Sequence, residues 1–306
     1  MKLSGLHLLL TYQCNFECDH CFVWGSPQQS GTMRLKDIRG ILRQAEALDT
    51  IESIYFEGGE PFLYYPIMLK GIEEAASRGF ATGVVSNSYW ATGVEDALEW
   101  LRPLAGLIQD LSVSSDLYHW DEELSQEVRN AQEAAAALGI PSDVLSIAQP
   151  EDPDAPGVTG QLPPGESAVM YRGRAAEKLA LQAPHHSWET FTECPHEDLR
   201  EPGRVHVDPL GHVHMCHGIL LGNMFRTPLT EICEGYDPDR HPVIGPLLAG
   251  GPAELARRYG LSLKEGYADA CHLCYETRLA LRERFPEILA PDQIYGAFED
   301  GVESGA

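Results

Sequence analysis

Two patterns of apolar residues alternate along the first half of the chain. Short apolar runs typical of buried strands precede stretches where apolar residues recur every three or four positions, as in amphipathic helices. The predicted strands are 6–10, 51–56, 81–85, 108–113, 142–147 and 168–171. The predicted helices are 35–48, 65–77, 94–101 and 121–138. This alternation predicts an α/β fold with a parallel sheet, and favours a partial (β/α)6 barrel over an open doubly wound sheet.

The alternation stops after residue 183. Residues 204–207 and 212–215 flank an Asp-Pro-Leu-Gly turn, which predicts a β-hairpin. A short helix is predicted at 228–233, and further helices are predicted at 253–259 and 272–285. We therefore expect two domains, residues 1–183 and residues 184–306, the second being a small module of a hairpin and helices. Residues 149–166, rich in proline and acid, predict either a surface insertion or a lid.

Charge and cysteine usage narrow the class of protein. The net charge of −24 over 306 residues repels phosphate backbones, so nucleic acid is not an expected partner. The apolar runs are too short to span a membrane, and the N-terminus lacks a signal-like cleavage site, so a cytoplasmic location without membrane contact is expected. The eight cysteines cluster at short spacings, which indicates metal binding rather than a disulfide scaffold.

The first cluster follows the first predicted strand. Cys14, Cys18 and Cys21 have the spacing C-x3-C-x2-C, one thiolate short of a closed tetrahedral site. Structural zinc sites close all four positions. Three thiolates can instead hold a 4Fe–4S cluster and leave one iron open for another ligand.

The end of the second predicted strand adds a second motif. The sequence YFEGGEP places Gly58, Gly59, Glu60 and Pro61 there. Together with the cysteine triplet, this order resembles the radical SAM superfamily. The resemblance implies that S-adenosylmethionine (SAM) binds the open iron and is cleaved to a 5′-deoxyadenosyl radical, which takes a hydrogen atom from the substrate. It also implies that backbone groups of Gly58–Pro61 contact the SAM amino group.

Further positions resemble SAM-binding positions of this family. They are Asn87 after the third strand, Ser114 and Asp116 after the fourth, and Arg172 or Arg174 as partner of the SAM carboxylate. Polar strand ends and a surface arginine pair are the alternative interpretation of these residues. Tyr12 and Phe22 are expected to wall the SAM pocket, with His20 near the adenine.

A second set of cysteines consists of Cys194, Cys216, Cys271 and Cys274. Four thiolates would close a structural zinc site or hold an auxiliary 4Fe–4S cluster. Residues 205–232 resemble the hairpin of the twitch and SPASM extensions of the radical SAM family, and the smaller twitch form implies one auxiliary iron–sulfur cluster. Cys233 is left over, either as a buried apolar residue or as a substitute ligand. His212, His214 and His217 are expected to support the site or lie at the surface.

These features predict a radical SAM oxidoreductase or maturase. The expected reaction is a two-electron oxidation of a small polar metabolite, with the auxiliary cluster accepting an electron from the substrate radical and flavodoxin or ferredoxin as external reductant. The chain begins 13 residues before Cys14, so no N-terminal leader-binding domain is expected, which favours a small molecule or a peptide presented by another protein. Peptide modification and a non-enzymatic electron carrier are the alternatives. Asp116, Tyr118 and His119 are candidate acid or base groups by position.

Overall fold

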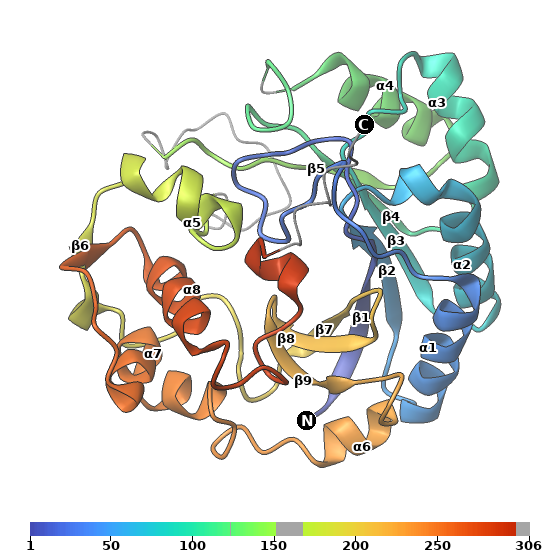
Figure 1. The fold of residues 1–306 in the computed structure, drawn as a ribbon. Helices are drawn as coiled ribbons and strands as arrows, with labels where there is room; N and C mark the ends of the chain where they lie inside the picture. Colours follow the sequence, from blue (N-terminus) through green and yellow to red (C-terminus); the bar gives the residue numbers. More distant parts are fainter. Residues whose placement is uncertain (123, 151–167, 298–306) are drawn as a thin grey trace, which may run out of the picture.

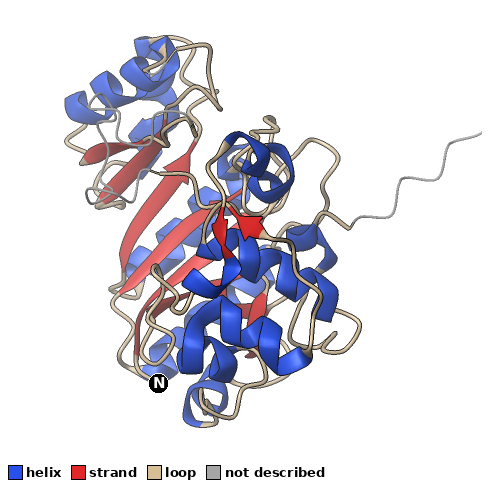
Figure 2. Ribbon diagram, turned by 90° about the vertical axis from the view of Figure 1, so that its left-hand side faces the viewer, coloured by secondary structure: helices blue, strands red, loops and turns tan. Residues whose placement is uncertain are grey.

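A computed structural model describes residues 1–122, 124–150 and 168–297. Its main feature is one eight-stranded sheet with the order β5-β4-β3-β2-β1-β7-β8-β9, which does not close into a barrel among these residues (Figures 1 and 2). Neighbouring strands run parallel from β5 to β7, and β8 and β9 continue antiparallel as a hairpin extension. The strands are β1 (Leu3–Thr11), β2 (Ser53–Gly58), β3 (Ala81–Ser86), β4 (Asp110–Ser114), β5 (Ser142–Leu145), β7 (Gly203–Val207), β8 (His212–Cys216) and β9 (Ile219–Asn223), with β6 (His186–Ser187) and β10 (Gly266–Tyr267) forming a separate pair.

Helices cover both faces of the sheet. The helices α1 to α4 lie on one side, and α5, α7 and α8 lie on the other (Figure 1). The α-helices are α1 (Leu35–Leu48), α2 (Tyr65–Ser77), α3 (Val94–Leu101), α4 (Gln126–Ala137), α5 (Arg174–Lys178), α6 (Leu229–Glu234), α7 (Ile244–Tyr259) and α8 (Ala270–Leu281). The 3-10 turns are η1 (Pro61–Tyr64), η2 (Arg102–Leu104), η3 (Ala180–Gln182), η4 (Trp188–Thr190) and η5 (Asp292–Tyr295).

The alternation of side chains along β1 separates two cores. Leu6, Leu8 and Leu10 join the main apolar core with residues of α1 and α2. Leu9 faces the other side and joins a second core with residues of α7 and α8. Successive strand residues point to opposite faces of a sheet, so His7 shares the side of Leu9. We call this side the inner face, because the cysteines of the second set lie there.

Most predicted elements are confirmed, with shifted ends. The helices 35–48, 65–77 and 94–101 are found with the predicted limits. Helix α4 begins at Gln126 rather than 121, because the Ser125 side chain caps it by accepting from the amide of Val128 at 3.2 Å. The predicted helix 253–259 is the second half of α7, after a break at Gly250 and Gly251. Helix α8 ends at Leu281 rather than 285.

The prediction of a strand at 168–171 is wrong. The amide of Tyr171 donates to Asp269 at the start of α8, and the amide of Arg174 donates to the carbonyl of Cys21. These bonds tie the segment to two loops instead of a neighbouring strand. The sixth parallel strand is β7, which pairs with β1 on the side away from β5. The parallel, partial-barrel architecture is therefore confirmed, but its sixth strand comes from the predicted second domain.

The hairpin at β7 and β8 is confirmed, and β9 extends it beyond the prediction. Because β7 pairs with β1, the two predicted domains share one sheet, and the division between residues 183 and 184 stays a prediction. The predicted loop at 149–166 lies, from residue 151 on, outside the described residues.

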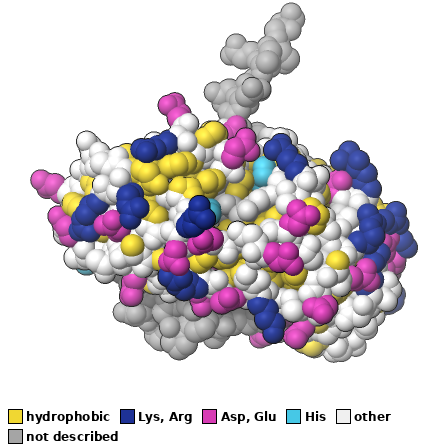
Figure 3. All heavy atoms as spheres, turned by 90° about the horizontal axis from the view of Figure 1, so that it is seen from below, with side chains coloured by type: hydrophobic (Ala, Val, Ile, Leu, Met, Phe, Trp, Pro, Cys, Tyr) yellow, Lys and Arg dark blue, Asp and Glu magenta, His cyan; other side chains and the backbone are white. Residues whose placement is uncertain are grey.

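The lower face of the molecule carries interspersed acidic and basic side chains among patches of apolar ones (Figure 3). Among the described residues, the helices are too short or too polar to cross a membrane.

Candidate functional site

The first cysteine loop, residues 12–26, follows β1 at the carboxyl end of the parallel strands. Cys14 and Cys18 are each only 8% exposed, and Cys21 is half-buried. The loop closes on itself, because the amide of Cys14 donates to the carbonyl of Ser26 at 3.0 Å. Burial raises the pKa of the Cys14 thiol to about 12, so binding a metal centre as thiolate must release a proton.

Arg174 fixes this loop from outside. Its buried guanidinium donates to the carbonyl of Cys18 at 2.7 Å and to the carbonyl of Gly25 at 2.8 Å. Its own amide donates to the carbonyl of Cys21 at 2.9 Å. The same guanidinium lies over the Trp24 ring. These contacts make Arg174 a brace of the cysteine loop, and its contact with a SAM carboxylate stays a prediction.

The Gly58–Pro61 turn docks against the base of the same loop. The amide of Gly59 donates to Thr11 at 2.7 Å, and the amide of Glu60 donates to Gln13 at 2.8 Å. A Cβ at position 59 would lie 2.0 Å from the carbonyl oxygen of Gln13, so only glycine permits this approach. The motif therefore holds the end of β2 against the cysteine loop.

The Glu60 carboxylate is fully buried and accepts hydrogen bonds at the ends of β2 and β3. It accepts from the amides of Phe62 at 2.9 Å and Asn87 at 2.8 Å, and from the hydroxyl of Ser86 at 3.0 Å. Burial raises the pKa of Glu60 to about 7, against the effect of these hydrogen bonds. Pro61 is also buried and begins η1.

Asn87 reaches the cysteine loop directly. Its side-chain amide donates to Asn15 at 2.9 Å and lies 3.6 Å from the sulfur of Cys14. Asn87 is 5% exposed, in keeping with its place at the end of β3. Asn87 therefore lies beside Cys14, the first cysteine of the loop.

A ring cluster adjoins the loop at Cys21. His20 lies 4.7 Å from the Tyr118 ring and 5.0 Å from the His119 ring. Asp116 accepts from His119 Nδ1 at 2.8 Å and from the amides of Tyr118, His119 and Ile147. Although burial acts to raise it, the His119 hydrogen bond holds the pKa of Asp116 below its usual value. The structure thus brings together the candidate acid–base residues and His20, while Ser114 ends β4 half-buried.

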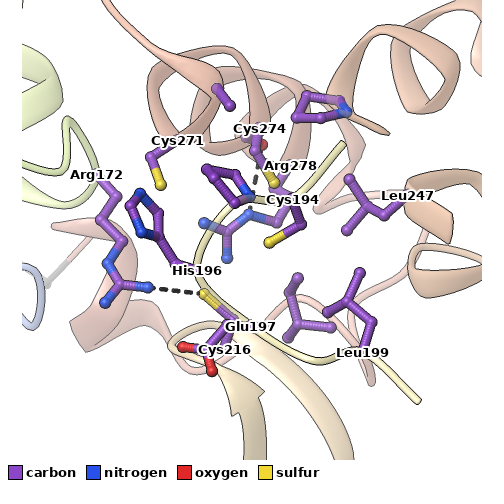
Figure 4. Close-up of a pocket in the computed structure, with 14 residues that line it drawn as sticks. Arg172, Cys194, His196, Glu197, Leu199, Cys216, Leu247, Cys271, Cys274 and Arg278 are labelled. Carbon is purple, nitrogen blue, oxygen red and sulfur yellow. Dashed lines mark hydrogen bonds between the residues drawn. The ribbon is translucent and has the colours of Figure 1, made fainter. Parts of the chain in front are cut away.

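The four cysteines of the second set line one pocket, the second cysteine pocket. Cys194 comes from the loop before β7, Cys216 from the end of β8, and Cys271 and Cys274 from the first turns of α8. Their sulfur atoms point toward a shared space (Figure 4). A helix N-terminus favours thiolates, and positions three apart share one face of a helix. The expected four-thiolate site is thus assembled from three separate elements.

The spacing of the sulfur atoms can be compared with the spacing that a single zinc ion requires. Among the residues described, groups of three or more metal-binding side chains whose ligand atoms lie within 4.8 Å of one another contain His, Asp and Glu but no Cys. Tetrahedral zinc with Zn–S distances near 2.3 Å would hold thiolates about 3.8 Å apart. Among the described residues, no three cysteines of either site lie mutually this close together.

Arg172 connects the two cysteine sites. Its guanidinium donates to the sulfur of Cys216 at 2.9 Å (Figure 4) and lies 5.0 Å from the centre of the Phe22 ring. Phe22 directly follows Cys21 in the first cysteine loop and is 38% exposed. Arg172 therefore faces the second cysteine pocket, and its predicted contact with the SAM carboxylate stays a prediction. Sequence patterns gave no sign of this bridge.

Two other predicted positions lie in the core. The Tyr12 ring is fully buried, and its hydroxyl donates to Asp208 at 2.9 Å, so Tyr12 joins the loop to the β7–β8 turn. Cys233 is 3% exposed in the main apolar core and does not line the second cysteine pocket, which confirms it as a buried apolar residue. His212 also hydrogen-bonds Asp208, through its Nδ1 at 2.9 Å. The ring centroids of His217 and Phe22 are 4.4 Å apart.

The sequence patterns did not predict one group of polar side chains on the inner face. His7, Glu57 and His206 place ligand atoms within 4.8 Å of one another. The available signal was a polar residue at the inward position of an apolar strand, as in Leu6-His7-Leu8 and Val205-His206-Val207.

Comparison with known proteins identifies a domain in the first half of the chain. Residues 8–140 match the model of the radical SAM superfamily. This part of the chain is a radical SAM domain. SAM and a 4Fe–4S cluster are accordingly its cofactors, and the three thiolates of the first cysteine loop, with Asn87 beside Cys14, fit a cluster with one open iron. A radical SAM enzyme needs a reductant and a substrate.

Two curated relatives match parts of the chain. YydG of Bacillus subtilis (strain 168), whose name proposes a role in peptide biosynthesis, is 29% identical over 125 residues, 40% of this chain and 39% of YydG. The tungsten-containing aldehyde ferredoxin oxidoreductase cofactor-modifying protein of Pyrococcus furiosus (strain ATCC 43587 / DSM 3638 / JCM 8422 / Vc1) is 35% identical over 110 residues, 36% of this chain and 29% of that protein. The matches span well under half of either relative.

Solved structures are similar at low identity. BtrN in complex with AdoMet and 2-DOIA has 15% identity and a TM-score of 0.45, over 76% of this chain and 82% of BtrN. Native anSMEcpe with bound AdoMet has 12% identity and a TM-score of 0.48, over 93% and 97%. Streptococcus suis SuiB bound to S-adenosylmethionine has 13% identity and a TM-score of 0.39, over 78% and 67%.

Proposed function

We propose that this radical SAM enzyme oxidises its substrate by two electrons, with a second 4Fe–4S cluster on Cys194, Cys216, Cys271 and Cys274 as electron acceptor. One observation carries the proposal: all four cysteines line a single pocket, and Arg172 of that pocket reaches Phe22 in the first cysteine loop. Four thiolates leave no open iron, so the second site is suited to electron transfer rather than to binding SAM.

The chain supplies positive charge at the second cysteine pocket. Arg172 and Arg278 are 8% and 1% exposed, and both line the pocket. Four thiolates on one cluster give it a net negative charge, and buried charges need compensation. Positive charge and hydrogen bonds to sulfur favour the reduced state of a cluster. The two arginines therefore suit a centre that accepts an electron.

The first site starts the reaction. When bound there, the cluster and SAM supply the 5′-deoxyadenosyl radical that removes a hydrogen atom from the substrate. Arg174 and Gly59 hold the loop that carries the three cysteines. Asp116 and His119 lie next to this loop through His20, and remain candidates for the group that takes the substrate proton.

We further propose a peptide as the substrate. The name of YydG refers to peptide biosynthesis, and this supports a peptide over the small metabolite expected from the sequence. Oxidation of a peptide would appear as a crosslink or a dehydrogenated residue. Ferredoxin or flavodoxin is proposed as the reductant.

The test is anaerobic reconstitution of the chain with iron and sulfide, followed by dithionite, SAM and a peptide encoded beside its gene. We expect 5′-deoxyadenosine and a peptide that has lost two hydrogen atoms, detected by mass spectrometry. The double variant Cys271→Ala/Cys274→Ala should still release 5′-deoxyadenosine but form no oxidised peptide. Full product formation by this variant would overturn the role of the second site as acceptor. Absence of 5′-deoxyadenosine from the loaded wild-type enzyme would overturn the enzymatic function itself.

A further inference from the structure

Three groups of metal-binding side chains on the described chain have ligand atoms within 4.8 Å of one another. In two of these groups, the carboxylate already accepts hydrogen bonds from backbone amides of nearby turns. Asp208 accepts from the Tyr12 hydroxyl and from amides of its own turn, at Leu210 and His212. Asp116 accepts from the amides that follow β4 and β5. Both carboxylates are thus explained by the turns they stabilise.

The third group is different. Among the residues that the structure describes, the Glu57 carboxylate has two polar side-chain partners, His7 Nδ1 at 3.3 Å and His206 Nε2 at 3.1 Å. Among the described residues it accepts from no backbone amide and pairs with no lysine or arginine. A carboxylate with little exposure and no fixed positive partner costs free energy unless a cation neutralises it.

The group sits on a rigid frame. His7 lies on β1, Glu57 on β2 and His206 on β7, three adjacent strands of the parallel sheet, and His7 pairs in register with both Tyr55 and His206. The His7 ring also stacks on the Tyr55 ring, with centroids 4.8 Å apart. Sites built on strands hold their ligands more precisely than sites on loops.

Buried polar atoms without partners concentrate here. Within the described part of the chain, His206 Nδ1 and both ring nitrogens of His217 are buried and have no hydrogen-bond partner. His206 and His217 are 8% and 3% exposed, and their ring centroids are 4.1 Å apart. Unsatisfied buried polar atoms are rare in native proteins and indicate a missing ion or water.

We propose that His7, Glu57 and His206 bind one divalent first-row transition-metal ion, such as Zn²⁺. Two imidazoles and one carboxylate are a donor set for such an ion, and they leave coordination positions free for another ligand. The ion would compensate the Glu57 charge, and ring contacts through His217 link its site to Phe22 of the first cysteine loop.

The experiment uses the wild-type chain reconstituted anaerobically with its iron–sulfur clusters and freed of excess metal. Zn²⁺ is titrated by isothermal calorimetry, and zinc and iron are counted in the same sample by mass spectrometry. We expect one zinc per chain with no loss of iron. Glu57→Gln and His206→Ala should weaken zinc binding at least about tenfold, and iron content equal to wild type shows that they fold.

His212→Ala is the matched control, because it removes a histidine from the Asp208 group on the same sheet. It should bind zinc like the wild type. Absence of zinc binding, zinc uptake matched by iron loss, or unchanged binding in Glu57→Gln would each overturn the proposal, and the last result would leave the residues as a hydrogen-bonded His–Glu–His group. The assay uses no SAM and no substrate, so its outcome is independent of the proposed reaction.

Discussion

The first cysteine loop and the second cysteine pocket are assembled in opposite ways. The first takes Cys14, Cys18 and Cys21 from one continuous loop after β1. The second gathers cysteines from a loop, a strand end and a helix that lie up to 80 residues apart, from Cys194 to Cys274. The first offers three thiolates and the second offers four. In the proposed function, one site is therefore open to a further ligand, and the other is closed by the protein.

The difference extends to the supporting arginines. Arg174 donates to backbone carbonyls of the first loop and shapes it. Arg172 donates to a cysteine sulfur of the second site, at 2.9 Å. A backbone contact fixes geometry, whereas a charged donor to sulfur changes the reduction potential of the bound centre. Two arginines separated by one residue thus serve two sites in two different ways.

Removal of cysteines should separate the two sites most strongly. The triple variant Cys14→Ala/Cys18→Ala/Cys21→Ala should lose all SAM cleavage and about four iron atoms per chain. The pair Cys271→Ala/Cys274→Ala should lose a similar amount of iron yet keep SAM cleavage. Iron content and 5′-deoxyadenosine release measure both effects. Equal loss of cleavage in the two variants would contradict the division of roles.

Substitution of Gly59 should disturb the first site, because Gly59 holds the end of β2 against the cysteine loop. A Cβ would lie 2.0 Å from the Gln13 carbonyl, so Gly59→Ala must move β2 or the cysteine loop and cost about 3 kcal/mol of unfolding free energy. Iron at the first site should fall with it. Gly40→Ala is the control, because in α1 its nearest neighbour is 3.9 Å away and alanine should stabilise the helix by about 0.5–1 kcal/mol. Chemical denaturation measures both; a Gly59→Ala protein as stable as wild type would refute the docking.

Substitution of Arg172 should have the smallest effect and act only on the second site. Arg172→Met removes a positive charge and a hydrogen bond to Cys216, so the potential of the second cluster should become more negative by up to about 100 mV. Arg172→Lys keeps the charge and should shift the potential less. Redox titration followed by electron paramagnetic resonance measures the change. A shift confined to the first cluster would argue against the assignment.

The contrast also explains what the sequence could predict. Cys14–Cys21 and Gly58–Pro61 are short contiguous motifs, and their meaning survives without knowledge of the fold. Helices α1, α2 and α3 were predictable because each has a continuous apolar stripe against one core. The gathering of the second set of cysteines was inferred through resemblance, since spacing alone does not determine which distant cysteines meet.

The features that the sequence did not predict depend on contacts between segments far apart in the chain. The segment 168–171 looked like a strand because it is apolar, but its backbone bonds with Asp269 and the Cys21 region exclude it from the sheet. Pairing of β7 with β1 joins His206 to His7 across nearly 200 residues, as no local pattern could indicate. The contact of Arg172 with Cys216 likewise requires the fold.

The most direct test of the two-site account is electron paramagnetic resonance of the dithionite-reduced chain, with and without SAM. In the Cys271→Ala/Cys274→Ala variant, the remaining cluster signal should change when SAM is added. In the Cys14→Ala/Cys18→Ala/Cys21→Ala variant, the remaining signal should be the same with and without SAM. A SAM-dependent signal in this triple variant would contradict the account, because the four-cysteine site would then be open.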